Sequence, residues 1–167
     1  MKYTSAEAAK LLRSLKDELE MVKTLENSSY KFVAAVSENV EDVRPEYDFA
    51  DCQKKIYELN TKIRKVKHAI NVFNTTHTVE GFDMTVDEML VYLPQLSEQL
   101  TKLTFYVRAL PKRRAPSNSS SNIIDYVYSN FDVSEAKEEY AKISDTISKA
   151  QLALDVLNST ETMEIDI

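Results

Sequence analysis

Residues 69–80 read AINVFNTTHTVE, and residues 153–164 read ALDVLNSTETME. At this offset of 84 positions, polar residues lie over polar residues and apolar residues over apolar ones. A second match, at an offset of 81, places residues 4–7 (TSAE) over residues 85–88 (TVDE). Two matches that flank middle segments of different length indicate a unit of roughly 80 residues that is written twice.

The duplication predicts how the chain is organised. The sequence has 167 residues, which is enough to bury one hydrophobic core. We expect a single domain over residues 1–167, with internal repeats at approximately 4–80 and 85–164. If the two copies pack together, a pseudo-two-fold axis relates them.

Helical periodicity dominates both copies. Apolar residues recur at alternating spacings of three and four from Phe49 to Phe73, and again from Val133 to Leu157. Only a helix places such a series on one stripe, and a sustained 3.5-residue period is typical of coiled-coil packing. Two more helices are predicted after the capping boxes at 4–7 and 85–88. The expected fold is mainly α: an antiparallel four-helix bundle built from a duplicated helix-strand-helix unit.

The strand of each copy is predicted from an aromatic and β-branched segment between its helices. These segments are residues 29–36 and 122–129. Because an isolated strand is marginal, we expect the two to pair with each other as a short two-stranded β element. Residues 112–121 have the composition of a flexible linker.

Composition limits the function classes. The chain has a net charge of −6, no long apolar run and one cysteine, Cys52. This balance makes a general nucleic-acid binder or a membrane-spanning protein unlikely and favours a soluble protein of the cytoplasm.

The sequence shows no catalytic or cofactor motif. His68 and His77 are nine positions apart, and neither lies at a metal-site or nucleophile–base spacing from Cys52. A single glycine leaves no material for a phosphate-binding loop. We therefore expect no enzyme activity, no metal and no cofactor, and we interpret Cys52 as a core residue.

The repeated Asn-x-Thr ends form the first candidate site. They comprise Asn74 and Thr76 in the first copy and Asn158 and Thr160 in the second. Antiparallel packing brings them to the same pole as the two capping boxes. The favoured interpretation is helix capping, with each Asn in the left-handed conformation. The alternative is a ligand-binding site or a subunit interface.

A cluster of cations forms the second candidate site. Arg108, Lys112, Arg113 and Arg114 mark the end of the third long helix. They complement its dipole there, and the acidic residues Glu38, Glu41, Asp42 and Glu46 of the first copy are candidate partners. The alternative is contact with an anion.

Several short motifs resemble those of the septicolysin-like proteins, which are small, largely uncharacterised bacterial helical proteins. The first is Ile70, Asn74 and Thr76 at a helix end, and a related Leu-Asp-x-hydrophobic-Asn-x-Thr series lies near the end of the chain at residues 154–160. A Gly-x-x-hydrophobic-Thr-hydrophobic-Asp stretch at residues 81–87 opens the third helix. The resemblance implies a helical fold, and the family name suggests a haemolysin.

Two functions agree with these observations. The favoured one is a non-enzymatic scaffold or interaction protein that forms homo-oligomers, since amphipathic helices and an exposed ribbon offer surfaces to partners. The alternative is a membrane-acting, toxin-like protein of the haemolysin type.

Overall fold

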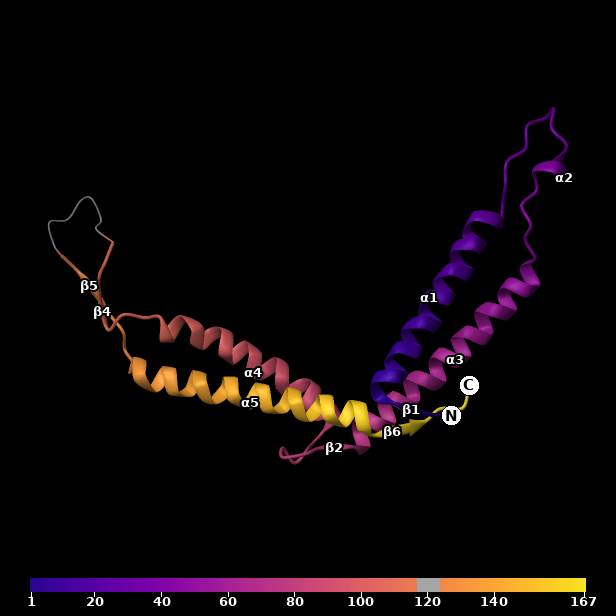
Figure 1. The fold of residues 1–167 in the computed structure, drawn as a ribbon. Helices are drawn as coiled ribbons and strands as arrows, with labels where there is room; N and C mark the ends of the chain where they lie inside the picture. The colour runs from indigo at the N-terminus through magenta and orange to yellow at the C-terminus, as the bar shows by residue number, and fades with distance from the viewer. Residues whose placement is uncertain (117–123) are drawn as a thin grey trace. The chain divides into compact units, whose positions relative to one another are not determined.

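The structure is a computed structural model, and it describes residues 1–116 and 124–167. The described chain is mainly helical, as predicted (Figure 1). Its helices are α1 (Ser5–Ser29), α2 (Val40–Val43), α3 (Phe49–Thr76), α4 (Val86–Val107) and α5 (Val133–Thr160). Its strands are β1 (Lys2–Thr4), β2 (Thr78–Val79), β3 (Met84–Thr85), β4 (Lys112–Arg114), β5 (Tyr126–Tyr128) and β6 (Thr162–Glu164).

Each long helix starts at a side chain that accepts a hydrogen bond from its first turn. Thr4 and Thr85 each accept the amide of the residue three positions on, and Glu7 and Glu88 bond back to the Thr amides, so both predicted capping boxes are confirmed. Asp48 accepts the Asp51 amide before α3, and Asp132 accepts the Ser134 amide before α5.

The chain forms two compact units. Unit 1 comprises residues 1–76 and 157–167, and unit 2 comprises residues 77–156. In unit 1, α1 and α3 lie side by side (Figure 1). Strand β1 pairs with β6 in antiparallel register, with Tyr3 opposite Met163. The core side chains of unit 1 come from α1, α3, the end of α5 and the segment that follows it: Ala8, Leu15, Leu19, Cys52, Leu59, Ile63, Val66, Phe73, Leu157, Met163 and Ile165.

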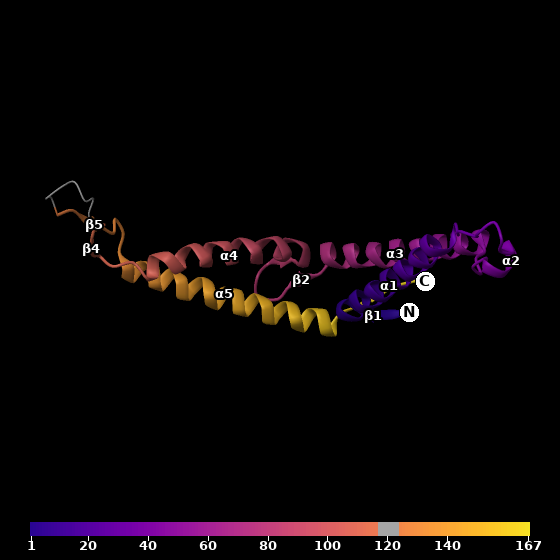
Figure 2. The same cartoon turned by 90° about the horizontal axis from the view of Figure 1, so that it is seen from above.

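Unit 2, like unit 1, contains two long helices and short paired strands. Helices α4 and α5 run side by side in both views (Figures 1 and 2). The short hairpin β2–β3 precedes α4, and its turn contains the positive φ angles of Gly81 (83°) and Asp83 (49°). The core of unit 2 is formed by Val79, Val86, Met89, Leu96, Ile143, Ala150 and Leu154.

Burial repeats at the offsets that the sequence suggested. Ala8 and Met89, 81 positions apart, are both completely buried, as are Val66 and Ala150, 84 positions apart. The strand pairs also connect corresponding parts of the two copies. The start of the first copy (β1) pairs with the end of the second (β6), and the end of the first (β2) pairs with the start of the second (β3). The four-helix bundle itself stays a prediction, because the structure places the helices in two units that are each described separately.

The predicted pairing of the two aromatic segments does not occur within the described chain. Residues 29–36 contain the end of α1 and irregular chain, and Val33 is 93% exposed. In the second segment, residues 122 and 123 lie outside the described chain, and β5 pairs with β4. Strand β4 lies in the stretch interpreted as a flexible linker. A strand forms where side chains find partners across it, and the first segment pairs with no strand among residues 1–116 and 124–167.

Candidate functional site

The basic cluster lies at the end of unit 2 where α4 ends and α5 begins. Arg108 follows the last residue of α4, and the other three cations form β4. The β4–β5 hairpin is fixed to the helix end by the Ser129 amide, which donates to the Pro111 carbonyl (3.1 Å), and by the Ser129 hydroxyl, which donates to the Leu110 carbonyl (2.9 Å). The rings of Tyr106 and Phe131 meet edge to face beside it, with centroids 5.1 Å apart. We call residues 108–116 and 124–129 the basic ribbon.

One face of the basic ribbon combines cations with aromatic rings. Lys112 lies opposite Tyr128, and Arg114 lies opposite Tyr126. Because side chains alternate along a strand, these four share one face, and Arg113 and Val127 share the other. The Lys112 ammonium lies 4.0 Å from the Tyr126 ring centroid and 5.3 Å from that of Tyr128. The cations were predicted from the sequence as a candidate site but the tyrosines were not, although the alternation in Tyr-Val-Tyr was a signal.

The cations of this ribbon are available to an external anion. Among the described residues, none of the four takes part in a salt bridge, and all four are exposed. The predicted intramolecular partner Glu41 is used elsewhere, in a two-pronged pair with Arg44 at 2.8 and 3.0 Å. The Arg44 guanidinium holds the pKa of Glu41 below its usual range.

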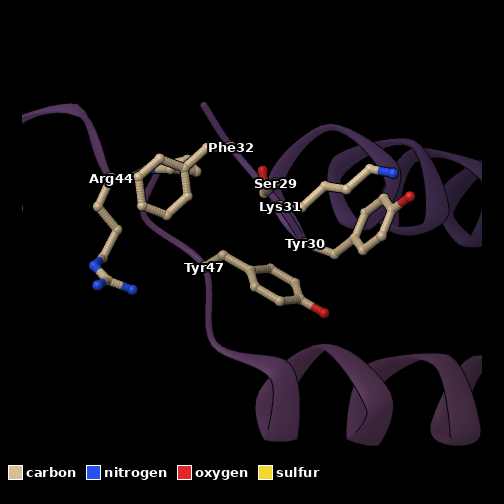
Figure 3. A pocket seen from close by; sticks show the side chains of 7 residues that line it. Ser29, Tyr30, Lys31, Phe32, Arg44 and Tyr47 are labelled. Carbon is tan, nitrogen blue, oxygen red and sulfur yellow. The ribbon is translucent and has the colours of Figure 1, made fainter. Parts of the chain in front are cut away.

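In unit 1, a loop connects α1 to α3, just as the basic ribbon lies between α4 and α5 in unit 2. We call residues 30–48, between α1 and α3, the acidic loop. Its side chains surround a hollow of about 340 Å³ lined by Ser29, Tyr30, Lys31, Phe32, Arg44, Pro45 and Tyr47 (Figure 3). The Arg44 guanidinium lies 5.3 Å from the Phe32 ring centroid, and the Lys31 ammonium lies 5.0 Å from that of Tyr30. Cation–π contacts therefore occur in the loops of both units.

The Asn-x-Thr residues all fall in unit 1. There, β6 contacts α3 and pairs with β1, directly ahead of α1. The left-handed caps predicted for Asn74 and Asn158 are wrong. Both residues lie inside helices that continue to Thr76 and Thr160, and positive φ among the described residues occurs at Gly81 and Asp83. The Thr76 hydroxyl donates to the Val72 carbonyl (2.7 Å) in the last turn of α3. Whether this pole binds a ligand or a subunit stays a prediction.

The residues considered for catalysis, Cys52, His68 and His77, differ in how far they are buried. Cys52 is buried in the core of unit 1, and burial raises the pKa of its thiol, with a smaller contribution from the nearby Glu26 carboxylate. His68 is exposed and His77 is half-buried. Within residues 1–116 and 124–167, no three His, Cys, Asp or Glu side chains are grouped so as to hold a metal ion. In the same part of the chain, no helix has the length and hydrophobicity of a membrane span.

Comparison with known proteins gives one informative match. No family model matches the chain, and no curated protein matches it. A crystal structure of a functionally unknown conserved protein from Corynebacterium diphtheriae is similar to it, with a TM-score of 0.62 and 15% sequence identity. The match covers 98% of this chain and 100% of that one. At this identity the likeness concerns the fold alone, and the resemblance to septicolysin-like proteins stays a prediction.

Proposed function

We propose that the protein is a non-enzymatic interaction protein that works by self-association. The observation that carries this proposal is the area of its surface. The chain exposes 12518 Å² at a mass of 19.1 kDa. A compact monomer of that mass exposes roughly 8,400 Å², and two separate compact bodies of half the mass expose roughly 10,100 Å² together.

The excess is larger than one interface requires. Even against two separate bodies it amounts to roughly 2,400 Å² for one chain, whereas each partner contributes about 600–1,000 Å² to a stable protein–protein interface. Part of the exposed surface belongs to large apolar side chains. Met21 on α1 is 72% exposed, Phe105 on α4 is 74% exposed and Leu152 on α5 is 67% exposed. A pair of helices buries one stripe on each member, so other apolar positions stay open to a partner.

The absence of an enzymatic role is part of the proposal. A catalytic cysteine requires a lowered pKa, because the thiolate is the nucleophile. Burial instead raises the pKa of the Cys52 thiol.

We also propose that the chain arose by internal duplication. Matched burial, matched helix caps and the reciprocal strand pairs support this origin.

The proposal is tested by the mass of the protein in solution. Light scattering coupled to size exclusion, from 1 to about 100 µM, should give a multiple of 19.1 kDa that decreases on dilution. A constant mass of 19.1 kDa over this range would contradict self-association.

A membrane-acting protein is the competing function. The exposed Tyr126 and Tyr128 beside Lys112 are the observation in its favour, because aromatic and cationic residues together suit a lipid headgroup region. Dye release from vesicles of mixed neutral and anionic lipid separates the two proposals. The self-association proposal expects no release, and release at micromolar protein would favour the competing function.

A further inference from the structure

The loops at the ends of the two units carry opposite charge. The acidic loop has two cations against five carboxylates, Glu38, Glu41, Asp42, Glu46 and Asp48, for a net charge of −3. The basic ribbon has four cations against the single carboxylate of Asp125, for a net charge of +3. One chain therefore carries two surfaces that are complementary in sign and equal in magnitude.

The charges of both surfaces are only partly used within the chain. In the acidic loop, Glu41 pairs with Arg44, and Glu38 accepts the Ala35 amide at 2.8 Å. Asp42 and Glu46 are exposed and make no salt bridge among the described residues. The four cations of the basic ribbon are likewise without a carboxylate partner there. Each surface thus retains the groups that would attract the other.

Apolar side chains accompany the charges on both surfaces. In the acidic loop, Val33 is 93% exposed and Val40 is 45% exposed. In the basic ribbon, Leu110 is 63% exposed and Tyr128 is 62% exposed. Apolar groups surrounded by charged ones are typical of a protein–protein contact, with an apolar centre and a polar rim. In the basic ribbon, an aliphatic group such as Leu110 contributes little to the binding of a nucleic acid, whose backbone is recognised by charge.

We propose that the acidic loop of one copy docks on the basic ribbon of a second copy. This inference rests on the proposed self-association and names the surfaces that carry it. The contact is heterologous, because two different surfaces meet. Each chain has one of each, so the contact repeats from copy to copy and produces a ring if the rotation closes or an open filament if it does not.

Charge reversal provides the test. One variant carries Arg113→Glu and Arg114→Glu, and a second carries Asp42→Lys and Glu46→Lys. A control carries Lys10→Glu and Lys16→Glu, two exposed cations of α1. All six positions are exposed, so thermal unfolding should be unchanged in all three variants. Sedimentation velocity then compares each variant with the native chain.

The expected result has three parts. Each charge-reversed variant alone should associate roughly tenfold or more weakly than the native chain, because like charges face each other at the contact. An equimolar mixture of the two should recover association, since the first retains a native acidic loop and the second a native basic ribbon. The control should associate as the native chain does. Raising the salt concentration should weaken association of the native chain and of the mixture.

The contrary outcomes separate the two proposals. If the native chain is a monomer, self-association itself is wrong. If the native chain associates and both variants associate equally well, only the loop-to-ribbon contact is wrong. The contact is also wrong if each variant is weakened but the mixture recovers nothing. Finally, a single-stranded oligonucleotide that binds all chains except Arg113→Glu/Arg114→Glu, with assembly unchanged in every one, would make the ribbon a polyanion site instead.

Discussion

The ammonium of Lys112 lies 4.0 Å from the centroid of the Tyr126 ring, across the pairing of β4 with β5. The side chains of both strands are exposed, so the hairpin is held by its backbone pairing, by the Ser129 hydrogen bonds and by this contact. A cation over an aromatic face at an exposed site contributes about 0.5–1 kcal/mol. The contact therefore adds to the backbone pairing of a segment whose composition is that of a linker.

Replacing Lys112 with Ala should loosen the ribbon. Loss of about 0.5–1 kcal/mol corresponds to a roughly two- to fivefold faster local opening, which amide hydrogen exchange at Val127 would report. Arg113→Ala, on the opposite face of the same strand, serves as the control and should leave the exchange rate unchanged. Equal acceleration in both variants would show that the cation–π contact is not the cause.

Truncation of Ile63 should cost more than truncation of Ile147. The two positions are 84 residues apart, which is the offset of the proposed repeat, but Ile63 is buried and Ile147 is half-buried. Ile63→Ala should lower the free energy of unfolding by roughly 2–5 kcal/mol. Ile147→Ala should lower it by less, because its environment already admits solvent. Urea unfolding measures both, and a larger loss at Ile147 would contradict the burial pattern.

Removal of the Thr85 side chain should change both stability and titration. The Thr85 amide (2.7 Å) and hydroxyl (2.8 Å) both donate to Glu88, and these bonds hold the pKa of Glu88 below its ordinary value. Glu88 therefore stabilises the fold above its unfolded pKa of about 4.3, and this contribution disappears as the pH falls through the lower folded value.

Thr85→Ala should cost roughly 0.5–2 kcal/mol at pH 7 and move the pKa of Glu88 upward. Carbon-detected NMR titration of the Glu88 carboxyl in the native and variant chains measures the shift. A pKa that stays lowered in Thr85→Ala would assign the effect to the backbone amide alone.

Substitution of the two repeated asparagines should not destabilise the helices. Asn74 and Asn158 lie inside α3 and α5, where Ala has the higher helix propensity by roughly 0.5 kcal/mol. Asn74→Ala and Asn158→Ala should therefore keep or slightly raise the melting temperature. If assembly is lost at an unchanged melting temperature, this pole is an interface. A clear decrease in melting temperature would indicate side-chain bonds that stabilise the folded chain.

The helices and their starts were predictable from the sequence because their causes are local. The three-four spacing from Phe49 to Phe73 lies within α3, and the Thr4 and Thr85 boxes lie where α1 and α4 begin. Strands depend on distant partners, which local patterns do not encode. The segment around Val33 has strong strand propensity but pairs with no strand in the part of the chain that the structure describes, whereas Lys112–Arg114 has weak propensity and pairs with β5.

The candidate site was predictable only in part for the same reason. Four cations near the end of a helix are visible in the sequence, but the placement of Lys112 and Arg114 on one face with two tyrosines follows from the register of β4 with β5. The conformation expected of Asn74 and Asn158 was wrong because each helix continues two residues further, to Thr76 and Thr160.

The pairing of Lys2 with Glu164 has a consequence for synthesis on the ribosome. Strand β6 is translated about 160 residues after its partner β1. At roughly 5–20 residues per second, β1 waits for many seconds, while α1 and α3 are already able to pair. Unit 2 is translated entirely within that interval, so it can fold before unit 1 is complete. Nascent chains of this protein therefore present an unpaired strand edge until translation reaches β6.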